Sequence, residues 1–193
     1  MRKVVVFKGV CVVSEIVDRI SQLLTHNGKE LYGGEAVTQT QHALQCAALA
    51  QAQGATEKLI TASLLHDIGH LLEPDFTTDH SGAHDMYHEN LGEAFLQQWF
   101  DEEVTEPVRL HVDAKRYLCA TDNSYLNILS PASIHSLKLQ GGPLSEGEVE
   151  TFEGNRYYKD AIRLRIWDDL AKDPDVITPD VAHFMKYVAQ SLV

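Results

Sequence analysis

The sequence Leu64-Leu65-His66-Asp67-Ile68-Gly69-His70 places a histidine and an aspartate side by side at the end of an apolar stretch. Asp67 has two carboxylate oxygens and can bridge two cations, while His66 offers a neutral nitrogen to one of them. His70 follows His66 by four residues, so on a continuous helix both side chains project from one face. Burying a charge among apolar residues requires a partner or a metal. The motif therefore predicts a two-metal site, which needs further ligands from elsewhere in the chain.

The composition predicts a globular protein with one compact domain. The chain has 193 residues, of which 44% are hydrophobic and 23% charged, enough for a real core. The net charge of −12 argues against nucleic-acid and membrane partners, although bound metals can reverse the local field for a small anionic substrate. Three dispersed cysteines without a CxxC motif argue against a disulfide framework and favour a cytoplasmic location. The composition leaves the oligomeric state open.

Apolar residues recur at helical spacing through most of the chain, so the expected fold class is all-α, in a single domain over residues 1–193. Capping signals set the expected ends, such as Ser130 followed by Pro131 at the first helical position. Residues 75–85 are expected to form a loop, and residues 1–10 an N-terminal arm or a short strand. The expected helices cover residues 12–25, 35–53, 56–72, 88–100, 107–111, 130–140, 156–171 and 179–192.

The candidate metal ligands lie on or at the ends of expected helices: His42, His66, Asp67, His88, His111 and Asp168. Four imidazoles and two carboxylates make a mixed nitrogen and oxygen set that suits iron, manganese or zinc. Each residue alone has an ordinary alternative. A lone helix histidine is more often a surface or core residue than a ligand, and Asp168 beside Asp169 could be a solvated pair. The remaining histidines are not assigned to the site: His26, His80, His84, His135 and His183.

The order of these ligands resembles that of the HD-domain superfamily, whose members are mostly phosphohydrolases. Further segments resemble a smaller branch, the mixed-valent di-iron oxygenases, which include myo-inositol oxygenase and the oxygenases that cleave 1-hydroxy-alkylphosphonates. The chain is most similar to the phosphonate-cleaving type, over Leu31 to Asp169. His111–Leu118 and Gln140–Pro143 are the most specific segments, because simple HD hydrolases do not need them. The other matching segments are 32–35, 41–47, 64–70, 88–89, 124–126, 129–133 and 165–168.

The resemblance implies a single HD-domain helical bundle with a di-metal site in its core. It also implies two iron ions, in the Fe2+ and Fe3+ states, with O2 as co-substrate. The second iron has fewer protein ligands than the first and so keeps open positions. One iron would be held by His42, His66, Asp67 and Asp168, and the other by the shared Asp67 with His88 and His111.

The activity that the resemblance implies is oxidative cleavage of the C–P bond of a 1-hydroxy-2-(substituted)aminoethylphosphonate. The products would be phosphate and glycine, or an N-methylated glycine such as glycine betaine, so the expected partner is a small-molecule organophosphonate. The alternative for the same ligands is a metal-dependent phosphohydrolase of a small phosphate ester or nucleotide. A third interpretation is a non-catalytic module that senses a ligand. The methylation of the amine and the stereochemical preference are left open.

Substrate contacts are expected beside the metal ligands. Lys115 lies four residues after His111, so both point into one pocket if the segment is helical. Arg165 lies three residues before Asp168, and the same argument applies. The ordinary alternative for both cations is a surface ion pair of little energetic weight. By the resemblance, the phosphonate contacts fall on His70, Lys115, Ser133, Ser136 and Arg165.

The loop Tyr32-Gly33-Gly34-Glu35 precedes the expected helix that carries His42. The resemblance places Glu35 and Tyr32 at the amine end of the substrate, with Tyr32 in an iron position until substrate arrives. The two glycines give the loop freedom to move. A loop that merely caps the following helix is the ordinary alternative. Arg116 points away from Lys115 on the same helix and is expected to be structural.

Overall fold

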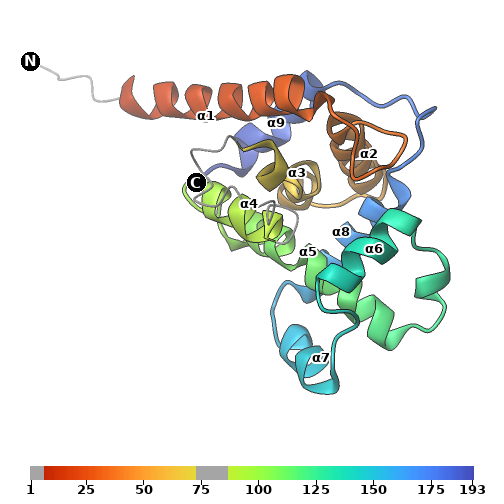
Figure 1. Ribbon diagram of the computed structural model, residues 1–193. Coiled ribbons are helices and arrows are strands. Elements are labelled where there is room, and N and C mark those ends of the chain that lie inside the picture. The colour runs from red at the N-terminus through yellow and green to blue at the C-terminus, as the bar shows by residue number, and fades with distance from the viewer. Residues whose placement is uncertain (1–6, 73–86) are drawn as a thin grey trace, which may run out of the picture.

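The computed structural model describes residues 7–72 and 87–193, and only the backbone of residues 7–13. Within these residues the expected all-α class is confirmed, since the described chain forms nine helices and three short 3-10 turns (Figure 1). The helices are α1 (Phe7–His26), α2 (Gln39–Ala52), α3 (Glu57–Leu65), α4 (His88–Leu96), α5 (Glu102–Thr121), α6 (Pro131–Leu139), α7 (Glu146–Glu153), α8 (Tyr158–Leu170) and α9 (Val181–Ser191). The 3-10 turns are η1 (Asn27–Lys29), η2 (Ile68–Leu71) and η5 (Tyr125–Asn127).

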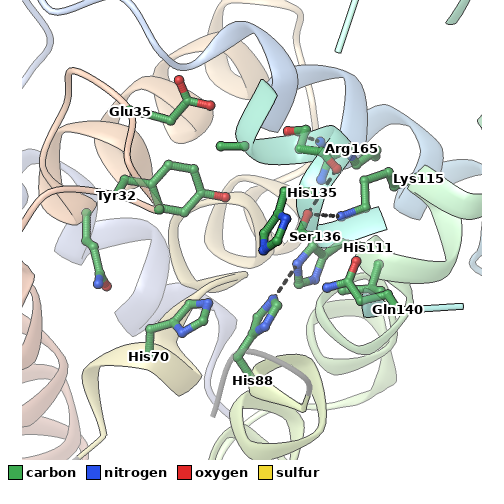
Figure 2. A pocket seen from close by; sticks show the side chains of 15 residues that line it. Tyr32, Glu35, His70, His88, His111, Lys115, His135, Ser136, Gln140 and Arg165 are labelled. Carbon is green, nitrogen blue, oxygen red and sulfur yellow. Dashed lines mark hydrogen bonds between the residues drawn. The ribbon is translucent and has the colours of Figure 1, made fainter. Parts of the chain in front are cut away.

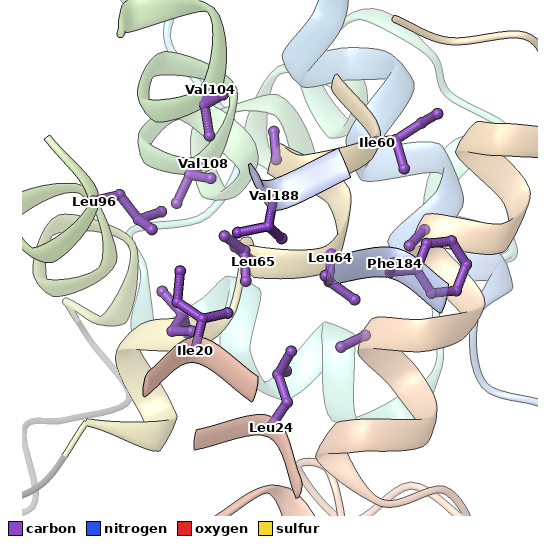
Figure 3. Close-up of a cluster of buried hydrophobic side chains, with 14 of the residues drawn as sticks. Ile20, Leu24, Ile60, Leu64, Leu65, Leu96, Val104, Val108, Phe184 and Val188 are labelled. Carbon is purple, nitrogen blue, oxygen red and sulfur yellow. The ribbon is translucent and has the colours of Figure 1, made fainter. Parts of the chain in front are cut away.

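Helix α3 lies in the middle of the bundle and packs against α2, α5, α8 and α9 (Figure 1). Residues 59–65 of this helix are all buried, which is the pattern of a helix surrounded by protein on every side. Figure 3 shows Ile60, Leu64 and Leu65 among apolar side chains from α1, α5 and α9. Full burial of each such side chain contributes about 1.5–3 kcal/mol. The His66-Asp67 pair therefore follows directly on a helix whose residues 59–65 are all buried in the core.

A second apolar cluster joins the lower part of α5 to α7 and α8. Its buried members are Leu110, Ala114, Leu144, Phe152 and Ala161. Arg116 of α5 lies nearby and donates to Asp113, to Glu148 of α7 and to the carbonyl oxygen of Gly142. Arg116 thus ties α5 to α7 and to the turn after α6, as expected for a structural residue.

Side-chain caps explain two of the expected helix starts that are wrong. Residues 35–38 are not helical, because Thr38 forms a capping box with Gln41 and α2 begins at Gln39. The helix expected at Pro107 begins five residues earlier, at Glu102, where the Asp101 side chain accepts a hydrogen bond from the Glu103 amide at 3.2 Å. Pro107 therefore lies inside α5, which continues to Thr121.

Helix α7 was not among the expected helices. Its start carries a recognisable signal, since Ser145 and Glu148 form a capping box. At the N-terminus, α1 begins at Phe7, so residues 7–10 are helical and the expected arm or short strand is wrong for them. Residues 1–6 and the expected loop at 75–85 lie outside the described residues. Among the described helices, none is long and apolar enough to cross a membrane.

Candidate metal centre and substrate pocket

The polypeptide leaves the α-helical path at the His66-Asp67 pair. His66 ends α3 with φ −59° and ψ −35°, whereas Asp67 has φ −101° and ψ 15° before η2 begins. Neighbouring side chains of a continuous helix point roughly 100° apart, and the break removes this constraint. The two side chains meet, with His66 Nε2 at 3.2 Å from Asp67 Oδ2. The continuous helix expected over residues 56–72 is therefore wrong, and His70 reaches the site from η2 rather than from the helix of His66.

One oxygen of Asp67 faces ligands from α2, α3 and α8. Asp67 Oδ2 lies 3.2 Å from His66 Nε2 and 3.7 Å from His42 Nε2. His42 Nε2 in turn lies 3.4 Å from Asp168 Oδ1. All four residues are buried. Tyr32 covers this group, because its ring stacks on the His42 ring at 3.8 Å between centroids. This is the closed side of the centre.

The other oxygen of Asp67 faces ligands from α4 and α5. Asp67 Oδ1 lies 3.3 Å from His88 Nε2 and 3.4 Å from His111 Nε2. The two imidazole nitrogens are 3.1 Å apart. Both histidines also line the neighbouring cavity, so this is the open side of the centre. The structure thus brings together all six candidate ligands around one carboxylate.

The hydrogen bonds of the histidines suit metal binding. His42, His66 and His111 donate through Nδ1 to the carbonyl oxygens of Ala171, Ser63 and Val108, at 2.9, 2.9 and 2.7 Å. These bonds leave each Nε2 lone pair directed at the centre. Converging lone pairs and carboxylate oxygens repel one another unless a cation lies between them. The donor set therefore fits two metal ions bridged by Asp67.

The charges of the centre lead to the same conclusion. Burial opposes ionisation of Asp67, but the neighbouring His66 imidazolium holds the pKa of this carboxyl well below its usual range. Burial likewise opposes the His66 imidazolium, yet Asp67 outweighs it and raises the pKa of His66 to about 9. Burial lowers the pKa of His111 to about 4. The ionised carboxylates demand buried positive charge, which a proton on His66 supplies in the metal-free chain and bound metal would supply in its place.

A cavity of about 160 Å³ adjoins the open side of the centre. It is lined by all seven expected substrate contacts. Figure 2 shows Tyr32 and Glu35 on one side of the cavity and Lys115 and Gln140 on the opposite side. His70 and His88 lie together, with their rings stacked at 4.1 Å between centroids. The cavity therefore has the volume and the polar lining for one small molecule beside the candidate metal centre.

Two buried cations lie at one end of this cavity. Lys115 and Arg165 are each only 3% exposed, which excludes the alternative of ordinary surface ion pairs. Burial, together with the nearby Arg165 charge, lowers the pKa of Lys115 to about 8. The Lys115 ammonium donates to Ser136 Oγ at 2.7 Å. This end of the cavity is suited to an anion, because protein carboxylates offset the positive charges of Lys115 and Arg165 only in part.

Arg165 is held in place by four acceptor residues, one of which is Ser133, whose Oγ lies at 3.5 Å. Its guanidinium donates to Asp168 Oδ2 at 2.6 Å, to the carboxylate of Asp169 and to Tyr125 Oη. Asp168 therefore faces His42 with one oxygen and Arg165 with the other. The candidate metal ligand His42 and the expected substrate contact Arg165 therefore share the Asp168 carboxylate, which links the two parts of the site.

The opposite end of the cavity is formed by the loop before α2. Gly33 and Gly34 have φ values of 50° and 87°, in the left-handed region that glycine adopts without strain. This turn brings Tyr32 over the closed side, where its hydroxyl donates to Asp168 Oδ1 at 3.5 Å. Glu35 accepts a hydrogen bond from Ser130 at the start of α6. The loop does more than cap α2, because it supplies one wall of the cavity.

Some residues near the cavity were not expected. Gln39 and Gln140 line it, and each has a buried side-chain oxygen without a hydrogen-bond partner. His135 lies exposed among the lining residues. Lys172 lies next to Ser133 and Glu35; it follows Arg165 by seven residues, a helical spacing that could have indicated it. His80 and His84 lie outside the described residues.

The family comparison agrees with this geometry. The model of the HD-domain family matches residues 40–171, a range that includes all six candidate ligands. The chain therefore belongs to the HD-domain family. This confirms the expected family and the helical HD-domain fold.

Within this family the chain belongs with the phosphonate dioxygenases. It is 46% identical over 173 residues to 1-hydroxy-2-(trimethylamino)ethylphosphonate dioxygenase (glycine-betaine-forming) of Leisingera caerulea, covering 90% of this chain and 88% of that protein. It is 43% identical over 179 residues to hydroxymethylphosphonate dioxygenase of Gimesia maris, covering 92% and 89%. An uncharacterized protein of Acanthamoeba polyphaga mimivirus is 35% identical over 158 residues, covering 81% and 72%.

Proposed function

We propose that this chain is an iron- and O2-dependent oxygenase that cleaves the C–P bond of a 1-hydroxy-2-(substituted)aminoethylphosphonate. The observation that carries the proposal is the cavity that joins the open side of a six-ligand centre to two buried cations, Lys115 and Arg165. The similarity to two phosphonate dioxygenases supports the reaction class. The buried free thiols of Cys46 and Cys119 support the proposed cytoplasmic location.

The proposed reaction balances with one O2. For the primary amine, 1-hydroxy-2-aminoethylphosphonate and O2 give glycine and phosphate. The C–P bond breaks, C1 becomes the carboxylate carbon of glycine, and phosphorus takes an oxygen in place of carbon. With a trimethylamino head group the organic product is glycine betaine, which is the product named for the Leisingera relative.

The cluster residues would hold two iron ions, one among His42, His66, Asp67 and Asp168 and one among Asp67, His88 and His111. Bound iron would supply O2 activation and accept and return the electrons of the oxidation. The open side has only two ligands besides the shared Asp67, which leaves room for a substrate to approach. The Tyr32 ring stacks on His42 and covers the closed side. This contact supports the proposal that Tyr32 occupies an iron position until substrate binds.

The cavity residues would bind and orient the phosphonate. Lys115 and Arg165 supply positive charge, and Ser133 and Ser136 supply hydroxyl groups on one helix face, while His70 adds an imidazole beside His88. Charge-assisted hydrogen bonds of this kind are the strong ones in a buried site. With the phosphonate at this end, an extended substrate directs its amine toward Glu35, across the cavity (Figure 2).

The competing function is hydrolysis of a phosphate ester by the same metal ligands. The similarity to two dioxygenases does not favour it, and a non-catalytic sensor would not need a complete ligand set beside a cationic cavity. The test is anaerobic reconstitution of the full chain with iron, followed by O2 consumption and phosphate release from 1-hydroxyphosphonates. Equal amounts of O2 consumed and phosphate released support the proposal. Phosphate release without O2 would support the hydrolase, and neither iron uptake nor turnover would support the sensor.

A further inference from the structure

Lys172 lies just beyond the end of α8 and contacts two residues of the cavity wall, Ser133 and Glu35. Its ammonium donates to Ser133 Oγ at 2.9 Å. It also lies 3.7 Å from Glu35 Oε1 and 3.8 Å from Asp169 Oδ1. Its side chain is only 12% exposed, so water screens these interactions weakly. Lys172 thus joins a residue at the phosphonate end to the carboxylate at the amine end.

The contact with Ser133 has a consequence for the phosphonate end. Ser133 Oγ accepts from Lys172 and, at 3.5 Å, from Arg165. A hydroxyl oxygen has two lone pairs, and both are then directed toward protein donors. The hydroxyl proton is left to donate into the cavity that Ser133 lines.

The contact with Glu35 has a consequence for the amine end. Glu35 Oε1 accepts from Ser130 Oγ at 2.5 Å and pairs with Lys172. Its negative charge is therefore already partly compensated before any substrate binds. A cationic head group near Glu35 meets the attraction of the carboxylate and the repulsion of the ammonium together.

We propose that Lys172 sets the head-group selectivity of the cavity. By pairing with Glu35 it lowers the preference for cationic head groups, and it keeps the cavity open to substrates with a neutral or absent head group. Lys172 is a positioning residue, because it acts through Glu35 and Ser133 and not on the reacting carbon. This inference rests on the proposed function, since it takes the cavity to be a phosphonate site.

The test compares two ligands of the same shape and different charge. 2-Aminoethylphosphonate and propylphosphonate differ only by an ammonium in place of a methyl group, and neither has the 1-hydroxyl that the reaction requires. Their affinities are measured by calorimetry on the iron-loaded full chain without O2. The readout is the ratio of the two affinities, because any loss through Ser133 weakens both ligands alike and cancels.

The variant Lys172→Met is expected to raise the ratio in favour of the amine about fivefold. Lys172→Gln removes the charge but retains a donor for Ser133, so it should raise the ratio similarly even if the methionine variant folds poorly. Lys172→Arg retains the charge and should keep the ratio within about twofold of the wild type. The matched control is Lys138→Met, which removes an exposed lysine of α6 that does not line the cavity and should leave the ratio unchanged.

Two results would overturn the inference in different ways. If both phosphonates bind the wild type and the ratio is the same in the methionine and glutamine variants, Lys172 does not set selectivity and the proposed function stands. If neither phosphonate binds the wild-type chain, the cavity is not a phosphonate site, and the proposed function and this inference both fail.

Discussion

The two sides of the Asp67 carboxylate are built from the same chemistry but differ in what surrounds them. On the closed side, His42, His66 and Asp168 are buried, and the Tyr32 ring stacks on His42. On the open side only His88 and His111 are present, and both line the cavity. The difference supports a division of work within the proposed centre: the closed side would hold a cation tightly, whereas the open side would leave positions for exchange.

The two sides also differ in how their imidazoles are oriented. His42 and His66 on the closed side each donate to a main-chain carbonyl, as does His111 on the open side. His88 lacks such a bond, since its Nδ1 lies 3.6 Å from Glu89 Oε2 and both atoms are without a hydrogen-bond partner. The stacked ring of His70 positions His88 instead. The open side is therefore expected to be the weaker metal site.

The largest expected effect comes from removing the shared ligand. Asp67→Ala should lower iron affinity on both sides by at least about 100-fold. Loss of a residue that only hydrogen-bonds a metal ligand already lowers metal affinity about 10–100-fold, and Asp67 would bind the metals directly. His88→Ala should empty only the open side, so that roughly half of the iron remains. Elemental analysis of reconstituted protein measures both. Asp160→Asn, at an exposed carboxylate paired with Arg163, is the control. Equal loss of iron in both ligand variants would contradict the distinction between the sides.

The next effect concerns the cationic end of the cavity. Lys115→Met should weaken phosphonate binding about 100-fold while the iron content is unchanged, because a buried charge-assisted hydrogen bond is lost. Loss of iron in this variant would mean that Lys115 is structural.

The lowered pKa of Lys115 makes the same end sensitive to pH. The ammonium is charged below its pKa of about 8 and neutral above it. In the wild type, kcat/KM for the phosphonate should therefore fall as pH rises through about 8, since this parameter reports the free enzyme. The fall should be absent in Lys115→Met. A wild-type profile that is flat between pH 7 and about 9 would contradict this assignment.

A smaller effect tests how the open side is supported. A Cβ on Gly69 would lie 2.0 Å from the His88 carbonyl oxygen, so Gly69→Ala must push η2 and α4 apart. We expect a loss of about 2 kcal/mol in the free energy of unfolding and weaker iron binding on the open side. Gly147→Ala in α7 is the matched control, because nothing lies within 4 Å of its added Cβ; it should be neutral or slightly stabilising. Denaturant titration and iron analysis distinguish the two.

The smallest effect concerns the amine end. Glu35→Gln should lower kcat/KM about fivefold for a substrate with a cationic head group. The same variant should leave kcat/KM for hydroxymethylphosphonate, which has no head group, nearly unchanged. Glu146→Gln, at an exposed residue of α7, should change neither. A loss of the same size for both substrates would mean that Glu35 acts only by holding Ser130 in place.

Much of this centre could be predicted from the sequence because metal ligands carry their own pattern. The helical pattern placed His42, His88 and His111 on or at the ends of expected helices, and the resemblance to the HD-domain family assigned them to one candidate centre. The break at Asp67 could not be predicted in the same way. Apolar periodicity continues through Ile68 and Leu71, and only the tertiary contacts of the site favour a helix end over one more helical turn.

Apart from His135 within α6, the cavity residues that were not expected lie at or beyond helix ends: Gln39, Gln140 and Lys172. Lys172 lies two residues beyond the end of α8 and enters the site because the chain turns at Ala171, whose carbonyl oxygen accepts a hydrogen bond from His42. Helix α7 is short and polar, so its start could be predicted only from the capping box of Ser145 and Glu148. Local side-chain caps therefore carried information that the hydrophobic pattern did not.

The orientation of the imidazoles has a consequence for how this protein tolerates change. Their Nδ1 partners are the carbonyl oxygens of Ser63, Val108 and Ala171, and every amino acid brings the same carbonyl to its position. Replacement of those three side chains leaves the acceptor in place, unless the new residue displaces the backbone. Main-chain atoms therefore orient these three imidazoles, and most side-chain substitutions at the three acceptor positions would leave that orientation unchanged.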